Sequence, residues 1–158
     1  MVTLLNVMVL CVMVRMPSMT VTAPPDTSPR EQAVALARAH FTLVTQRRVA
    51  IPHLVGVVLA LEDRFLEAEA GIRPTSAPEI VREFQRRAHT ALLAAYGDVL
   101  RVWDRIPDAS MDLDRIVTLI AALADGFALR QIADPDGATG DTFAEAAVGL
   151  LESLTRPR

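Results

Sequence analysis

The chain has 158 residues, enough for one domain that buries a hydrophobic core. Hydrophobic residues make up 51% of it and aromatic residues only 4%, so its apolar side chains favour helices over sheets. The net charge of −3 argues against nucleic-acid binding by this chain, because such binding needs clustered cationic side chains. The single cysteine, Cys11, cannot form an internal disulfide, so a reducing cytoplasm is the expected location.

The first 27 residues are expected to form an apolar tail and a linker rather than part of the folded domain. Residues 2–14 are an apolar run, and residues 17–29 are rich in Pro, Ser and Thr. The run is shorter than the roughly 20 residues of a membrane-spanning helix, and it lacks the preceding basic residues of a signal peptide. We expect no membrane association, with export or anchoring through this run as the alternative.

Residues 28–158 are predicted to form an all-α domain, a bundle of about five main helices. The first helix covers residues 29–48 and has a specific start. Ser28 is its N-cap, Pro29 occupies the first helical position, and Glu31 completes a capping box. Apolar residues then recur at helical spacing, and no segment of the chain alternates with the period of two that is typical of strands.

Two further helices precede residue 107. One begins near Pro52 and ends before Gly71. The next has a capping box at its start, from Ser76 to Glu79, and its apolar pattern could continue to Arg105. Gly97 lies inside this pattern, so a kink there is possible.

The last two helices are predicted at about residues 112–133, capped by Asp112 or Ser110, and at about residues 142–154. The first of these has apolar residues in steps of 3, 4, 3 and 4, which form a seam for another helix: Leu113, Ile116, Ile120, Leu123 and Phe127. The alternative is that this stripe faces the core of its own domain, as most apolar stripes do.

No catalytic motif, phosphate-binding loop or dinucleotide fingerprint occurs in the sequence, so an enzyme is the least supported class. The three histidines, His40, His53 and His89, lack the spacing of metal ligands on one helix face, and neither a metal nor another cofactor is expected. The adjacent carboxylates Glu62 and Asp63 are interpreted as a solvated helix face rather than as an acid-base pair.

The stretch from Met111 to Asp136, with the helix that follows it, resembles the end of TetR-type transcriptional regulators. The shared features are an acidic helix start at Asp112, the Asp125-Gly126 pair inside an apolar helix, the turn at residues 134–136 and a last Leu-rich helix. The likeness extends over roughly residues 29–154. The family's helix-turn-helix has no counterpart before Ser28, so direct contact with nucleic acid is not expected.

The resemblance implies a homodimer, because the last two helices of this family pair with their copies in a second subunit. The residues expected at that interface are Leu113, Ile116, Ile120, Leu123, Phe127, Phe143, Ala147, Leu150 and Leu154. It also implies an effector pocket among the middle helices for a small apolar or aromatic molecule. The residues expected to line it are Phe41, His53, Val57, Phe84, Ala88, Leu92, Tyr96 and Trp103, although each of these is also explained as ordinary core or surface.

The leading functional hypothesis is therefore a TetR-like domain that binds a small effector and homodimerises without a DNA-binding half of its own. The main alternative is a helical interaction protein without a ligand, which forms heterodimers with a full-length regulator. A filled interior between the middle helices would favour this alternative.

Overall fold

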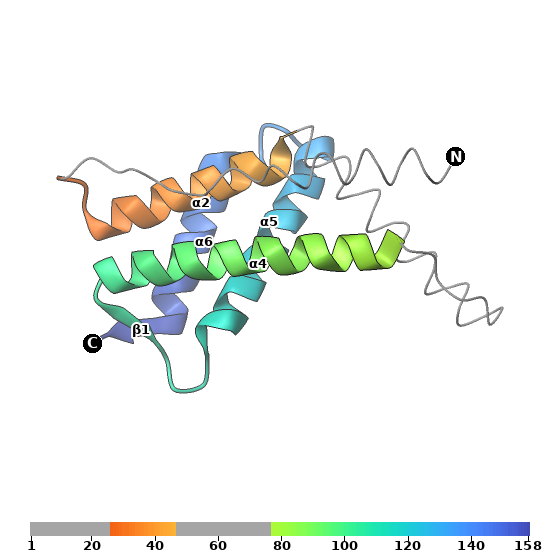
Figure 1. The fold of residues 1–158 in the computed structure, drawn as a ribbon. Helices are drawn as coiled ribbons and strands as arrows, with labels where there is room; N and C mark the ends of the chain where they lie inside the picture. Colours follow the sequence, from red (N-terminus) through yellow and green to blue (C-terminus); the bar gives the residue numbers. More distant parts are fainter. Residues whose placement is uncertain (1–25, 47–76) are drawn as a thin grey trace. The chain divides into compact units, whose positions relative to one another are not determined.

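The computed structural model of the protein describes residues 26–46 and 77–158 (Figure 1). In these residues the chain forms four helices and a two-stranded sheet, which confirms the all-α prediction. The elements are α2 (Pro29–Thr45), α4 (Ala77–Val102), β1 (Arg105–Pro107), α5 (Leu113–Ala133), α6 (Gly140–Leu154) and β2 (Thr155–Pro157). The helix predicted to begin near Pro52 lies outside the described residues.

The chain divides into two compact units. One comprises residues 1–17 and 46–88, and its described part is chiefly the beginning of α4. The other comprises residues 18–45 and 89–158, and it holds α2, the rest of α4, both strands, α5 and α6. In this second unit α2 packs on α6, and α5 contacts both of them. The account of the core below concerns this unit.

The predicted helix starts are borne out at α2 and α5. The backbone N–H of Ser28 donates to Glu31 Oε2 over 2.8 Å, and the N–H of Glu31 donates to Ser28 Oγ over 3.3 Å, which is a complete capping box. At α5 the carboxylate of Asp112 accepts the backbone N–H of Arg115 over 2.7 Å. Asp112, and not Ser110, is therefore the cap.

The last helix starts two residues earlier than predicted. Its cap is Thr139, whose hydroxyl accepts the backbone N–H of Thr142, and the hydroxyl of Thr142 accepts the backbone N–H of Thr139. Threonine fills both positions of this capping box, so the usual glutamate or glutamine signal is absent from the sequence.

Two helices end earlier than their apolar patterns allow. Helix α2 ends at Thr45 rather than at residue 48, and α4 ends at Val102 rather than at Arg105. Beyond Val102 the backbone of Asp104 is left-handed, with φ of 54°, and the chain then enters β1. Strand β1 pairs antiparallel with β2, with Ile106 opposite Arg156, in a small sheet that the sequence pattern did not predict. Gly97 causes no break, and α4 runs through it.

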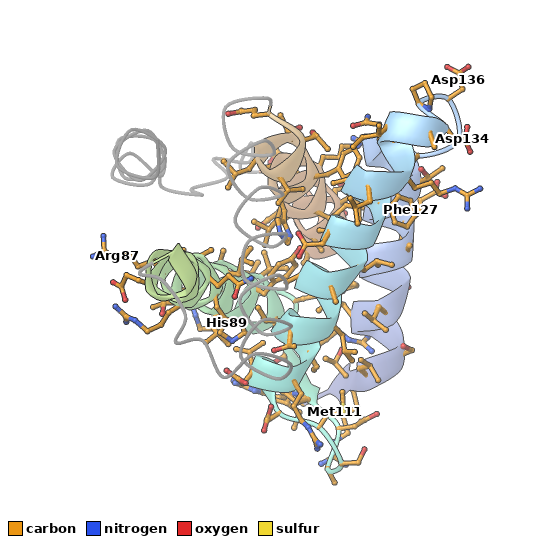
Figure 2. All side chains as sticks on the ribbon, turned by 90° about the vertical axis from the view of Figure 1, so that its right-hand side faces the viewer. Arg87, His89, Met111, Phe127, Asp134 and Asp136 are labelled. Atoms are coloured by element: carbon orange, nitrogen blue, oxygen red, sulfur yellow. The ribbon has the colours of Figure 1, made fainter. Side chains whose placement is uncertain are left out.

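Helices α5 and α6 lie side by side and antiparallel, joined by the turn that carries Asp134 and Asp136 (Figure 2). Figure 2 also shows Phe127 near the turn end of α5 and Met111 before its other end. The core is formed by side chains from the second unit's four helices. Its fully buried large members are Leu36, Tyr96, Ile116, Val117, Ile120, Phe143, Val148 and Leu151.

Candidate functional site

A polar pair lies inside this apolar core. His40 of α2 is 3% exposed and Tyr96 of α4 is fully buried, and the Nδ1 atom of His40 lies 3.3 Å from the hydroxyl of Tyr96. Among the described residues, no hydrogen-bond partner faces the second ring nitrogen, Nε2. Polar side chains are rarely buried without hydrogen-bond partners, so the pair is an unusual feature of an otherwise apolar interior.

Two aromatic rings, those of Tyr96 and Phe143, contact the ring of His40, and further aromatic residues pack on Phe143. The ring of Phe143 meets the His40 ring edge-on at 5.8 Å, and it stacks on Phe41 at 5.4 Å. Phe127 adds a further edge-on contact with Phe143 at 5.7 Å. These contacts join α2, α5 and α6, and Tyr96 adds an edge-on contact with His40 from α4. We call His40, Phe41, Tyr96, Phe127 and Phe143 the aromatic cluster.

Burial sets the protonation of the polar pair. Loss of hydration lowers the pKa of His40 from its ordinary 6.5 to about 4, and the negative charge of Asp125 opposes this effect only in part. Burial likewise raises the pKa of the Tyr96 hydroxyl. At neutral pH both groups are therefore uncharged, and one donates the hydrogen bond that the other accepts.

Three of the predicted effector residues, Phe41, Leu92 and Tyr96, belong to one buried core cluster. Ala88 is half-buried, and Trp103 is half-buried near the end of α4. The guanidinium of Arg105 lies over the Trp103 ring at 5.3 Å. The remaining predicted positions, His53, Val57 and the side chain of Phe84, lie outside the described residues.

His40 was not predicted as a site residue. It lies one turn from Leu36 and Ala37 on the face of α2 that also carries Phe41, and all four residues are buried. That position on an apolar face was the available signal. Its partner on α4 could not be identified from the sequence.

The residues predicted to form a dimer interface are covered within a single chain. Four of them are fully buried: Ile116, Ile120, Phe143 and Ala147. The other five are partly buried and pack against the same core: Leu113, Leu123, Phe127, Leu150 and Leu154. All nine residues therefore contact the core of their own chain, as the alternative interpretation expects, and their role in a dimer stays a prediction.

A different face of α5 is exposed and apolar. Among the described residues the large hydrophobic side chains with high exposure are Leu119 at 44%, Leu129 at 53%, Ile132 at 73% and Val102 at 47%. The first three lie on α5 and the last on α4. By length and composition α5 alone among the described helices could cross a membrane, and only 22% of its most apolar 18 residues is buried in the chain.

The described polar surface carries ion pairs on α4 and between helices. The carboxylate of Glu83 accepts hydrogen bonds from Arg86 and Arg87 within α4, and these bonds lower its pKa. His89 on α4 lies 2.8 Å from the carboxylate of Asp114 on α5, with both side chains partly exposed. The described residues contain no group of three potential metal ligands. The two features that call for a functional explanation are therefore the aromatic cluster and the exposed face of α5.

Comparison of the chain with protein-family models, with curated proteins and with solved structures gave no match.

Proposed function

We propose that this protein is a helical association domain of a regulator, similar to the carboxy-terminal part of TetR-type proteins, and that it forms a homodimer through the exposed face of α5. The observation that carries the proposal is the exposure of two leucines, Leu119 and Leu129, on the same side of α5. Ile132, the most exposed large hydrophobic residue of the helix, lies further round its circumference. The interface proposed here differs from the seam predicted from the sequence, whose residues are buried or partly buried against the core of their own chain.

The hydrophobic effect supports this choice. Each Å² of apolar surface that is removed from water contributes about 25 cal/mol. Covering three exposed large side chains on one helix would therefore favour association of the monomers. Scattered exposed leucines need no explanation, whereas an apolar helix face of this kind is typical of an interaction site. A symmetric dimer is the commonest way for a soluble chain to cover such a face.

The effect of one charge tests the proposal. We expect Leu129→Glu to turn a dimer into a monomer in light scattering over a concentration series. Val102→Glu is the matched control, because Val102 is similarly exposed but lies on α4. Ile120→Glu would be uninformative, since Ile120 is fully buried and a charge there would unfold the chain.

A wild-type protein that stays monomeric at high concentration would refute the homodimer. Light scattering of a mixture with a full-length TetR-type regulator would then test the alternative, in which this chain pairs with such a partner.

A second part of the proposal is a small aromatic effector that binds at the aromatic cluster. The supporting observation is His40 Nε2, a buried nitrogen that faces no partner among the described residues and could bond a polar group on an apolar ring. Phenol is a suitable probe because it combines one ring with one hydroxyl. We expect millimolar phenol to raise the melting temperature of the wild type more than that of His40→Phe, and equal shifts would refute this part.

A further inference from the structure

The buried pair of Tyr96 and His40 is arranged for the transfer of a proton along its hydrogen bond. With the imidazole hydrogen on Nε2, the phenolic hydroxyl donates to Nδ1 over 3.3 Å. Among the described residues no other base lies within hydrogen-bond distance of this hydroxyl. We infer that Tyr96 is a redox-active tyrosine, which gives one electron to an external oxidant and its proton to His40. This activity goes beyond the proposed function and does not depend on it.

The reaction involves the two rings and one acceptor of electrons. Tyr96 loses one electron to a one-electron oxidant in solution, and its O–H bond breaks as an N–H bond forms at Nδ1 of His40. The products are a neutral tyrosyl radical, an imidazolium and the reduced oxidant. A phenol that has lost an electron is a far stronger acid than a neutral phenol. The imidazole is therefore basic enough to take the proton, although burial lowers its pKa to about 4.

The surroundings of the pair keep the transferred proton on His40. The negative charge of Asp125 on α5 favours the protonated imidazole. Phe143, which meets the imidazole edge-on at 5.8 Å, can neither donate nor accept a proton. Burial keeps both rings away from bulk water. The proton therefore stays beside the tyrosyl oxygen and returns to it when the radical is reduced.

Trp103 supplies a route from the surface to the buried tyrosine. Its backbone N–H donates to the carbonyl of Val99 over 2.9 Å, so the helical course of α4 extends to it. Seven residues separate it from Tyr96, which places the two side chains on the same side of the helix and about 10 Å apart along its axis. Tyr96 is fully buried, whereas Trp103 is half-buried against the same core. An oxidant at the surface therefore meets the indole first, and an electron from the phenol then fills the vacancy on the indole.

Arg105 makes this transfer favourable. Its guanidinium lies 5.3 Å from the centre of the Trp103 ring. A cation at that place opposes the positive charge that oxidation creates on the indole. At Tyr96 the loss of the proton to His40 keeps the oxidised ring neutral. The oxidising equivalent therefore moves from Trp103 to Tyr96.

Flash oxidation of the full chain tests the inference. Light converts tris(bipyridine)ruthenium(II), with a cobalt(III) quencher, into a one-electron oxidant that is too large to enter the core. The chain has one tyrosine and one tryptophan, so electron paramagnetic resonance and transient absorption assign each radical to one residue. We expect a tryptophanyl signal that decays as a tyrosyl signal rises, more slowly in heavy water because a proton moves with the electron. A wild type that forms only the tryptophanyl radical would overturn the inference, and equal rates in the two solvents would overturn the coupled proton transfer.

Two substitutions separate the base from the route. His40→Gln keeps a hydrogen-bond acceptor beside Tyr96 but cannot take up its proton, so the tyrosyl signal should be lost and the tryptophanyl signal should persist. Trp103→Phe should delay the tyrosyl signal. His89→Gln is the control, because it changes a partly exposed histidine of α4 and should leave both signals unchanged. A tyrosyl signal of wild-type size in a His40→Gln protein with an unchanged circular dichroism spectrum would overturn the role of His40. An undelayed signal in Trp103→Phe would overturn the route.

Discussion

Acidification should destabilise this protein through one residue, His40. The imidazole is uncharged in the folded state because burial lowers its pKa from 6.5 to about 4. The unfolded chain exposes the same ring to water, where its pKa returns to about 6.5. Between these two pH values the unfolded state binds a proton and the folded state does not. The contribution of His40 to the free energy of unfolding is therefore fully present above pH 6.5 and is lost as the pH falls towards 4.

The size of the effect follows from the two pKa values. They differ by about 2.5, and a tenfold change in proton affinity corresponds to about 1.4 kcal/mol, so the full loss is about 3 kcal/mol. Roughly 2 kcal/mol of this should already be lost at pH 5. That is a large part of the stability of an ordinary domain, which is about 5–15 kcal/mol.

Urea unfolding at fixed protein concentration, repeated from pH 8 to pH 5, measures this loss. The control is His40→Gln, which keeps a polar side chain at the position but does not titrate. The wild type should lose stability steadily below pH 6.5, and the variant should show a much flatter profile. Parallel profiles for the two proteins would refute the assignment of the loss to His40, because every other titrating group is common to both.

Three further substitutions test particular contacts by urea unfolding. Tyr96→Phe leaves the Nδ1 atom of His40 without its partner and should cost about 1–3 kcal/mol, whereas a double variant with His40→Leu should cost less than the sum of the two single changes. Asp104→Gly should stabilise the protein by about 1 kcal/mol, because the backbone there is left-handed and glycine adopts that conformation without a Cβ clash; no gain would contradict this. Arg105→Lys should cost about 1–3 kcal/mol because lysine cannot reproduce the guanidinium's bonds to Thr155 Oγ1 at 2.8 Å and to the Thr155 carbonyl at 2.6 Å, and an unchanged midpoint would mean that water replaces them.

Helices were the predictable part of this fold because their start signals are local. Ser28 with Glu31, and Asp112 alone, satisfy backbone N–H groups within three residues, so the sequence contains the whole interaction. The ends of the helices are less local. Val102 ends α4 where the chain turns into β1, and that strand is stabilised by β2, which lies about 50 residues further along the chain.

The sequence alone could not determine which surface covers each apolar stripe of a helix. Helix α5 has apolar residues on most of its circumference, so helical periodicity accommodates both the stripe with Ile116 and Ile120 and the stripe with Leu119 and Leu129. Burial separates them, since the first pair is covered by the chain's own core and the second pair is exposed. Only the packing of α2 and α6 against α5 makes that distinction, and this packing depends on contacts between distant segments.

The same distinction explains why a glycine in α5 is informative. Glycine inside a helix costs about 1 kcal/mol relative to alanine, and chains keep it where another backbone or side chain approaches closely. Gly97 of α4 has such a reason within the chain, because a Cβ there would lie 3.2 Å from the Leu113 side chain. Gly126 has no such neighbour, although it lies in the middle of an exposed apolar stripe. The proposed dimer would account for Gly126 together with the exposure of Leu119 and Leu129, because a helix of the partner subunit would approach α5 there, whereas Gly149 of α6 also has open space and has no such explanation.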